Sequence, residues 1–268
     1  MRKQSSSPTP LNPRNHIFAA LGAAVLVLTA LPASATLYRV TGGSAAFTLT
    51  EGAAASIFEF DAYFDDTRTR AQVLADPAPG NAPFVETATS ISLSDPIRPY
   101  GVLASITGRT PQVTTLEFDD SDVMGSWTLS NDSYGFTGNT TLGEQIALTS
   151  MQRWTGPFTG SLLYGDFALR RTSATELKLT SNIDFVNAEF ASILNPTISV
   201  VGDTLTISGD LRIDQGLNLL DSTAVVGTDF GDFTLTATIQ AVPEPSTAAL
   251  IGLGVLLPFL RKKKDTSR

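Results

Sequence analysis

Residues 197–208 read TISVVGDTLTIS, two runs of alternating polar and aliphatic residues on either side of Gly202-Asp203. A period of two places successive side chains on opposite faces of a strand, so that one face is apolar and the other polar. Glycine followed by Asp matches the short turns that connect hairpin strands. The stretch therefore predicts an antiparallel β-hairpin with its turn at residues 202 and 203.

The same alternation recurs through the middle of the chain. Residues 56–64 place Phe58, Phe60 and Phe64 on one face, and residues 231–239 alternate again. Threonine is frequent at the positions expected to face water, which is typical of strands that are wet on one side. Further strands are expected at residues 37–41, 45–50, 84–93, 102–107, 113–118, 145–151, 162–169 and 176–180.

These patterns predict an all-β fold for residues 36–241. We expect an antiparallel β-sandwich with a jelly-roll-like topology, because many short strands are separated by turn residues. A β-solenoid would need a repeat of fixed period, and the sequence has none. The one segment that could form a short helix is residues 64–75, where Asp65 and Asp66 precede residues 67–74. The Pro- and Gly-rich residues 76–83 read either as a linker between two domains or as a loop within one, and we favour one domain.

The first 35 residues predict a secretory signal helix. A basic start is followed by the uncharged apolar run from Ile17 to Leu31. Ala33 and Ala35 frame an A-x-A site for signal peptidase, so that the mature chain would begin at Thr36. The alternative is an N-terminal membrane anchor that stays uncleaved.

The other end of the chain has three elements in a fixed order. The extended motif Pro243, Glu244 and Pro245 comes first, and the apolar run from Ala248 to Leu260 follows it. A helix of this length measures about 20 Å, short of a hydrocarbon core of roughly 30 Å. A basic cluster then supplies a stop-transfer signal that keeps the tail in the cytoplasm. The cluster consists of Arg261, Lys262, Lys263 and Lys264.

This order resembles the PEP-CTERM sorting signal of exopolysaccharide-producing Gram-negative bacteria. The resemblance covers residues 242–268 alone, and Pro258 near the end of the apolar run departs from it by introducing a possible kink. It implies that an exosortase recognises and cleaves the tail at the inner membrane. The protein would then reach the cell surface or the extracellular polysaccharide matrix. The resemblance implies nothing about the fold of residues 36–241.

The composition of the 268-residue chain excludes several kinds of catalytic and metal-binding site. It has no Cys, and its one His is His16, within the predicted signal. Cysteine nucleophiles, Ser-His-Asp triads, His- or Cys-bound zinc, haem axial histidines and iron–sulfur clusters are thereby excluded from the mature chain. Residues 36–241 hold 24 acidic against 10 basic residues, so nucleic acid is an unsuitable partner. We expect neither a resident cofactor nor an enzyme activity.

An acidic cluster in the middle of the chain suggests a calcium site, because Ca²⁺ takes six to eight oxygen ligands. The EF-hand template fails here, since Met124 and Asn131 occupy positions that need ligands. The alternative is a solvated turn after a strand. The cluster consists of Glu117, Asp119, Asp120 and Asp122.

Aromatic residues offer a second kind of candidate site. Trp127 and Trp154 are predicted either to stack on sugar rings or to belong to the core. Lys178 is the one Lys of residues 36–241, and alternation makes it a solvent-facing strand residue, which gives little support for Ser-Lys catalysis.

Two functions are compatible with these features. The first is a non-enzymatic, exported structural or adhesive protein of the cell surface or of the biofilm matrix. The second is a secreted carbohydrate-active hydrolase or carbohydrate-binding module on a jelly-roll scaffold. A hydrolase would need a pair of carboxylates on a concave sheet face.

Overall fold

The chain divides into two units, residues 1–35 and 36–268, and every residue described below belongs to the second. The computed structural model describes residues 36–50, 59–63, 68–75, 90–130, 143–156, 160–183, 188–220 and 225–243.

The predicted signal with Ala33 and Ala35, and the predicted transmembrane run from Ala248 to Leu260, lie outside these residues. So does the basic cluster from Arg261 to Lys264. Within the part of the chain that is described, no helix is both long and apolar enough to cross a membrane.

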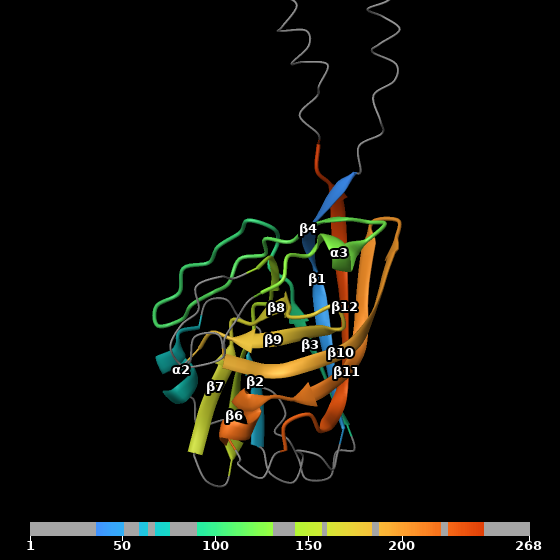
Figure 1. The fold of residues 1–268 in the computed structure, drawn as a ribbon. Coiled ribbons are helices and arrows are strands. Elements are labelled where there is room, and N and C mark those ends of the chain that lie inside the picture. Colours follow the sequence, from blue (N-terminus) through green and yellow to red (C-terminus); the bar gives the residue numbers. More distant parts are fainter. Residues whose placement is uncertain are drawn as a thin grey trace, which may run out of the picture. The chain divides into compact units, whose positions relative to one another are not determined.

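A nine-stranded antiparallel sheet forms most of the domain (Figure 1). Its strand order is β3-β1-β12-β11-β10-β9-β8-β5, and β4 pairs with the first part of β1. The strands are β1 (Leu37–Thr50), β3 (Ser90–Pro96), β4 (Glu117–Asp119), β5 (Gln145–Ala147), β8 (Ala168–Arg171), β9 (Glu176–Ser181), β10 (Ala188–Val201), β11 (Thr204–Ile213) and β12 (Asp229–Ala241).

The predicted hairpin at residues 197–208 is confirmed. β10 and β11 pair from Val201 and Thr204 onward, with the turn at residues 202 and 203. Gly202 adopts φ +62°, a conformation that glycine reaches without steric penalty. Leu205 and Ile207 are fully buried, whereas the alternate residues of β11 are partly exposed. The period of two therefore fixes which face of the sheet carries the core.

The first and last strands of the domain lie side by side. β1 and β12 pair over eleven positions, with a register shift between Val40 and Gly42. Gly43 allows this irregularity, because it has φ +125° and a Cβ there would lie 2.2 Å from the carbonyl oxygen of Thr236. Alternate residues of β12 enter the core with their partners on β1.

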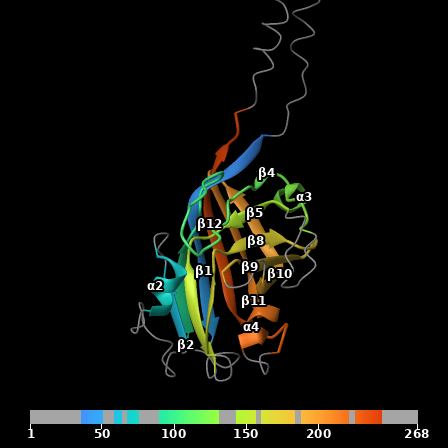
Figure 2. The ribbon, with the colours of Figure 1, turned by 90° about the vertical axis from the view of Figure 1, so that its left-hand side faces the viewer.

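A second sheet of three strands packs on the core of the first (Figure 2). Tyr164 lies in the main core, with its ring centroid 5.2 Å from that of Phe190. The neighbouring Leu163 points the opposite way into a smaller core with Val73 and Met151. The small sheet thus separates the main core from a helix. The elements are β2 (Glu59–Tyr63), β6 (Met151–Gly156), β7 (Gly160–Gly165) and the helix α2 (Arg70–Ala75).

Helix α2 confirms a short helix within residues 64–75 and occupies the C-terminal half of that segment. Its start has a reciprocal cap: Thr69 Oγ1 accepts from the N–H of Gln72 at 3.2 Å, and Gln72 Oε1 accepts from the N–H of Thr69 at 2.7 Å. Two more short helices are α3 (Val123–Ser126) and α4 (Gln215–Leu220).

The all-β, antiparallel prediction is confirmed, but the jelly-roll topology is wrong. A jelly roll needs strands distant in sequence to alternate between two sheets. Here β8 to β12 follow one another as a meander in which each strand pairs with the next along the chain, although α4 lies in the connection between β11 and β12. The strand predicted at residues 102–107 is also wrong, since that segment is a loop that exposes Val102 and Leu103.

The contact between β1 and β12 can be tested by mutation. Phe233 packs edge-on against Phe47 at 5.4 Å, and both rings are buried. We expect Phe233→Ala to lower the free energy of unfolding by about 3–5 kcal/mol, because it leaves a cavity in the core. Thr236→Ser on the wet face of the same strand should change it by less than about 0.5 kcal/mol. Urea denaturation of both variants measures the difference, and equal effects would contradict this role of the aromatic pair.

Candidate functional site

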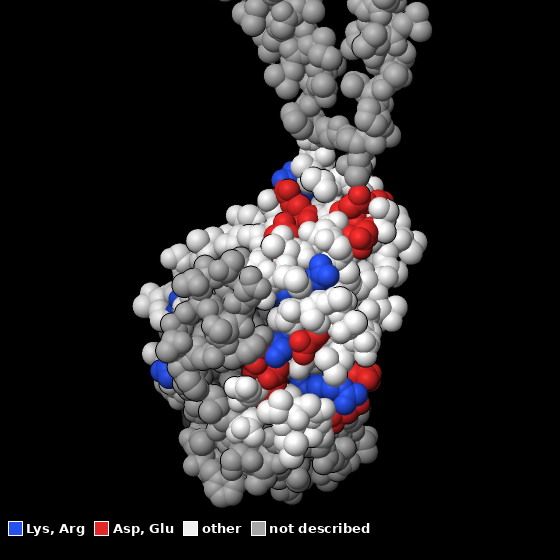
Figure 3. All heavy atoms as spheres, in the orientation of Figure 1, with Lys and Arg blue, Asp and Glu red and all other residues white. Residues whose placement is uncertain are grey.

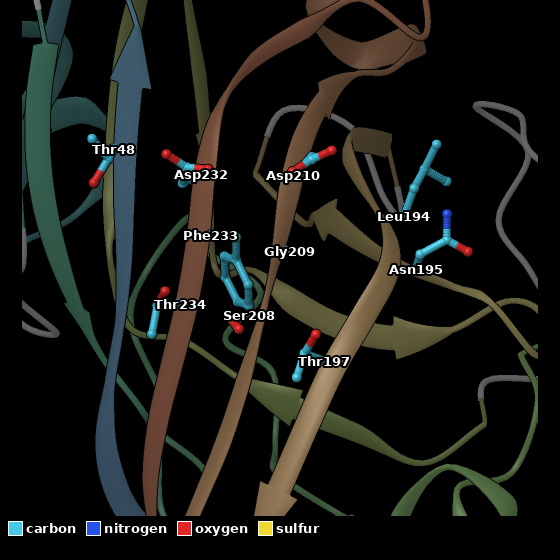
Figure 4. Close-up of a pocket in the computed structure, with 10 residues that line it drawn as sticks. All are labelled: Thr48, Leu194, Asn195, Thr197, Ser208, Gly209, Asp210, Asp232, Phe233 and Thr234. Atoms are coloured by element: carbon cyan, nitrogen blue, oxygen red, sulfur yellow. The ribbon is translucent and has the colours of Figure 1, made fainter.

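The outer, wet face of the main sheet holds a pocket of about 590 Å³. Its walls come from four neighbouring strands, β1, β12, β11 and β10 (Figure 4). A volume of this size lies within the range of small-molecule sites in proteins. The lining residues are Thr48, Leu194, Asn195, Thr197, Ser208, Gly209, Asp210, Asp232, Phe233 and Thr234.

The hollow arises where β10 departs from regular pairing. The register with β11 shifts between Leu194 and Thr197, which leaves Asn195 and Pro196 unpaired with β11. Asn195 has φ +46°, a left-handed conformation that Asn tolerates better than most residues. On β11, a Cβ at Gly209 would lie only 2.8 Å from Cγ2 of the buried Ile193, so the missing side chain permits the close approach of the two strands.

Two carboxylates stand opposite each other in the pocket. Asp210 on β11 and Asp232 on β12 are register partners and both are exposed. Like charges at directly opposed positions destabilise a sheet. Arg212 Nη2 offsets part of this repulsion, since it lies 3.2 Å from Asp210 Oδ2. The charge that remains is negative and faces the hollow.

Hydroxyl groups continue the site along the sheet. Thr234, Ser208 and Thr197 form one row across three strands, and Thr236 and Thr206 lie in the next. Neighbouring strands are about 4.8 Å apart, and alternate residues of a strand are about 6.8 Å apart. The result is a regular lattice of hydroxyls next to two carboxylates.

The chemistry of the lining favours a ligand rich in hydroxyl groups. Seven of the ten lining residues carry side-chain oxygen or amide groups, and none of the ten is basic. Carboxylates accept strong hydrogen bonds from ligand hydroxyls, and threonine hydroxyls both donate and accept. Phe233 is the one aromatic residue of the lining, and its ring is buried in the core. The lining residues therefore present polar groups and no aromatic face for stacking.

Sequence reasoning did not find this pair of carboxylates. Alternation alone puts Asp210 on the wet face with Ser208, and Asp232 on the wet face with Thr234. Their juxtaposition depends on the register between β11 and β12, which no local pattern specifies.

The predicted calcium cluster lies at the end of the domain that holds β4 and α3, where acidic side chains gather in Figure 3. Asp119 Oδ1 accepts from the hydroxyl of Ser121 at 2.7 Å and from its N–H at 2.9 Å, and these hydrogen bonds lower the pKa of Asp119. Asp122 caps α3 by accepting from the N–H of Gly125 at 2.8 Å. Both carboxylates thus hold the turn together.

Glu117 of the same cluster hydrogen-bonds Tyr100, which raises the pKa of that phenol. Among the described residues, no group of three or more acidic side chains is arranged to hold a metal ion. The calcium site at Glu117, Asp119, Asp120 and Asp122 stays a prediction.

The prediction of sugar stacking by Trp127 is wrong. Its side chain is 0% exposed and belongs to the core, and its Nε1–H donates to the carbonyl of Glu144 at 2.6 Å. The residue follows α3, whose cap at Asp122 turns the chain inward. Trp154 lies in β6, where it pairs with Leu162, and its side chain is outside the described part of the structure.

The prediction that Lys178 faces solvent is also wrong. Its side chain is only 12% exposed, and Nζ lies 2.5 Å from Glu189 and 3.1 Å from Asp214. Ser192, its register partner on β10, donates to Asp214 at 3.0 Å. The ammonium group is therefore used in two ion pairs, which gives it a structural role on the sheet.

A buried polar network lies where the two sheets meet. Arg109 forms a bidentate pair with Asp166 at 2.6 and 3.1 Å, and both side chains are 0% exposed. Asp95 is also fully buried and accepts from the N–H groups of Thr149 at 3.1 Å and Ser150 at 2.9 Å, and from Ser150 Oγ. Burial raises the pKa of Asp95 to about 7.

The start of the predicted sorting motif belongs to the folded domain. Ala241 at the end of β12 pairs with Tyr38, and the N–H of Val242 donates to the carbonyl of Leu37 at 2.8 Å. Pro243, the first motif residue, follows directly and is exposed. Glu244 and Pro245 lie outside the described residues.

Residues 241–264 match the PEP-CTERM protein-sorting motif, which confirms the resemblance found in the tail. The match covers the C-terminal tail only and marks an exported protein that undergoes an exosortase-dependent sorting step at a membrane. Searches of curated proteins and of solved structures gave no significant match.

The buried carboxyl group of Asp95 makes stability depend on pH. Its pKa rises from 3.8 to about 7 on folding, so between these values the folded state binds more protons than the unfolded state. We expect the free energy of unfolding to fall as the pH rises from 4 to 7, by up to about 4 kcal/mol from this group. Denaturation at a series of pH values measures this slope.

Asp95→Asn should reduce that slope, because the amide imitates the protonated acid; the remaining slope comes from Asp166, whose pKa is also raised by burial. Asp119→Asn is a control in which stability changes with pH in the opposite direction. The pKa of Asp119 is lowered in the folded state, so this carboxylate stabilises the fold above pH 4 and loses that effect as the pH falls further. An unchanged slope between pH 4 and 7 in Asp95→Asn would contradict the assignment.

Proposed function

We propose that this chain is an exported, non-enzymatic protein of the cell surface or extracellular polysaccharide matrix, delivered through its PEP-CTERM tail. The observation that carries the proposal is the sorting motif attached directly to the last strand of a closed β-domain. Signal peptidase and exosortase are its processing partners, and the inner membrane of a Gram-negative cell holds it in transit. The predicted leader and basic cluster support this route.

The acidic character of the domain supports a role outside the cell. Residues 36–241 carry 14 more acidic than basic residues, which keeps the domain soluble and away from anionic lipid. It contains no Cys, so its stability in an oxidising compartment depends on the core and not on disulfides.

Replacing Pro243, Glu244 and Pro245 with three alanines tests the route. We expect the full-length precursor to accumulate in the membrane of the native host, because an alanine run extends a helix and removes the exposed, extended stretch that a protease binds. Mass spectrometry of membrane and extracellular fractions measures retention of the tail. Normal release of the altered chain would show that the tail is only an anchor.

Within this function, the pocket on the outer sheet is the proposed binding site for matrix polysaccharide. Its carboxylates and hydroxyls suit a neutral, hydroxyl-rich glycan, whereas an anionic polymer would be repelled. Asp232 and Ala241 are nine residue steps apart along β12, which amounts to about 30 Å of extended strand. The pocket is thus held well away from the point where the tail begins.

Asp232→Asn should weaken binding to the neutral fraction of the host polysaccharide roughly ten-fold, since it removes a charged acceptor worth about 1.5–3 kcal/mol. Asp203→Asn is a matched control, because it removes the same charge at the hairpin turn of the same sheet. Co-sedimentation measures both. Equal binding by the two variants would contradict the assignment of the pocket.

The carbohydrate-active hydrolase is the second candidate. The facing pair Asp210 and Asp232 favours it, because glycosidases work with two carboxylates. New reducing ends in the same incubations, absent with Asp232→Asn, would support hydrolysis over adhesion.

A further inference from the structure

The pocket on the outer sheet carries an excess of negative charge. Asp210 and Asp232 lie at the same level of the neighbouring strands β11 and β12, and none of the ten lining residues is basic (Figure 4). The guanidinium group of Arg212 offsets part of this charge, since Nη2 lies 3.2 Å from Asp210 Oδ2 and 3.8 Å from Asp229 Oδ2. Three carboxylates against one guanidinium leave a net negative charge at this end of the sheet.

Asp232 is the carboxylate whose charge is least compensated. In the part of the chain that the structure describes, no side chain forms an ion pair or a hydrogen bond with its carboxylate. Its partner across the β11–β12 ladder is Asp210, and like charges at opposed positions destabilise a sheet. A cation bound beside Asp232 relieves this repulsion. Charge complementarity therefore favours a ligand with a positively charged group.

The rest of the lining indicates what kind of cation fits the pocket. Thr234 on β12 pairs with Ser208 on β11, which pairs in turn with Thr197 on β10. This row of hydroxyls lies about 6.8 Å from the carboxylates along the strands, within reach of the same sugar ring. Its members donate to and accept from ligand hydroxyls. A lysine side chain brings positive charge but no hydroxyl group for this row, so the lining favours an amino sugar.

We infer that the pocket prefers polysaccharides whose sugars carry a free, protonated amine, such as glucosamine units, over neutral glycans. This inference rests on the proposed binding of matrix polysaccharide at the pocket and names the class of sugar. The ammonium group has three N–H donors for the carboxylates at the level of Asp232, and the hydroxyls of the same sugar bind the row at Thr234. Hydrogen bonds between charged groups are stronger than those between neutral groups. An N-acetyl group removes the positive charge and with it this advantage.

Isothermal titration calorimetry of the full chain in a non-ionic detergent tests this preference. The probes are oligomers of equal length of glucosamine, of N-acetylglucosamine and of lysine, at physiological ionic strength. We expect the glucosamine oligomer to bind about ten-fold more tightly than the N-acetylglucosamine oligomer. Asp232→Asn should remove most of this preference. Asp203→Asn, the matched control, removes the same charge at the exposed hairpin turn and should keep the preference.

The lysine oligomer measures attraction by charge alone, so Asp232→Asn should weaken its binding no more than Asp203→Asn does. A larger effect would show that the pocket recognises amines without the sugar and would overturn the inference.

Thermal unfolding is the control for folding. Asp232→Asn should unfold at the wild-type temperature or slightly above it, because the change removes a contact between like charges. Equal affinity of the wild type for the two sugar oligomers would overturn the inference and leave the proposed binding of a neutral glycan standing. Absence of binding to the glucosamine oligomer would also overturn it. If the wild type does not co-sediment with the host polysaccharide either, the proposed role of the pocket fails as well.

Discussion

The pairing of β1 with β12 is the constraint on which the rest of this structure depends. It joins the two ends of the domain over eleven residue pairs and places Phe47 against Phe233 in the core. The entropy of closing so long a loop must be offset by burial along the whole strand pair. Once this pair forms, β1 lies beside the last strand of the β8–β12 meander. The first and last residues of the domain then lie at the same end of the sheet.

The same strand, β12, connects the C-terminal sorting signal to the candidate binding surface. The tail begins where β12 ends at Ala241, and the pocket lies at the other end of the same strand, around Asp232. A single strand of 13 residues therefore sets the distance between the sorting signal and the site. The domain presents a hydroxyl-rich face with two carboxylates at a defined separation from its attachment point.

Buried charges stabilise the junction of the two sheets. Arg109 comes from the loop that follows residues 102–107, and it reaches Asp166 in the tight turn between β7 and β8. Burial of these groups is tolerated because the pair is bidentate and Thr110 adds a third hydrogen bond to Asp166 at 3.2 Å. Burial raises the pKa of Asp166 despite its guanidinium partner, and it also raises the pKa of Asp95, whose neighbours donate hydrogen bonds without a full opposite charge.

Local pattern by itself determined much of this protein. The period of two predicted β12 and the hairpin halves of β10 and β11, residues 197–201 and 204–208, because strand alternation is a local property of the backbone. The ordered tail predicted the sorting signal, since such signals are read as linear sequence. Only the tertiary structure decided the order of the strands and the burial of Trp127. It also decided that Asp210 and Asp232 lie opposite each other. Each depends on which distant segments pair and in which register, and that choice is made by the packing of the whole core.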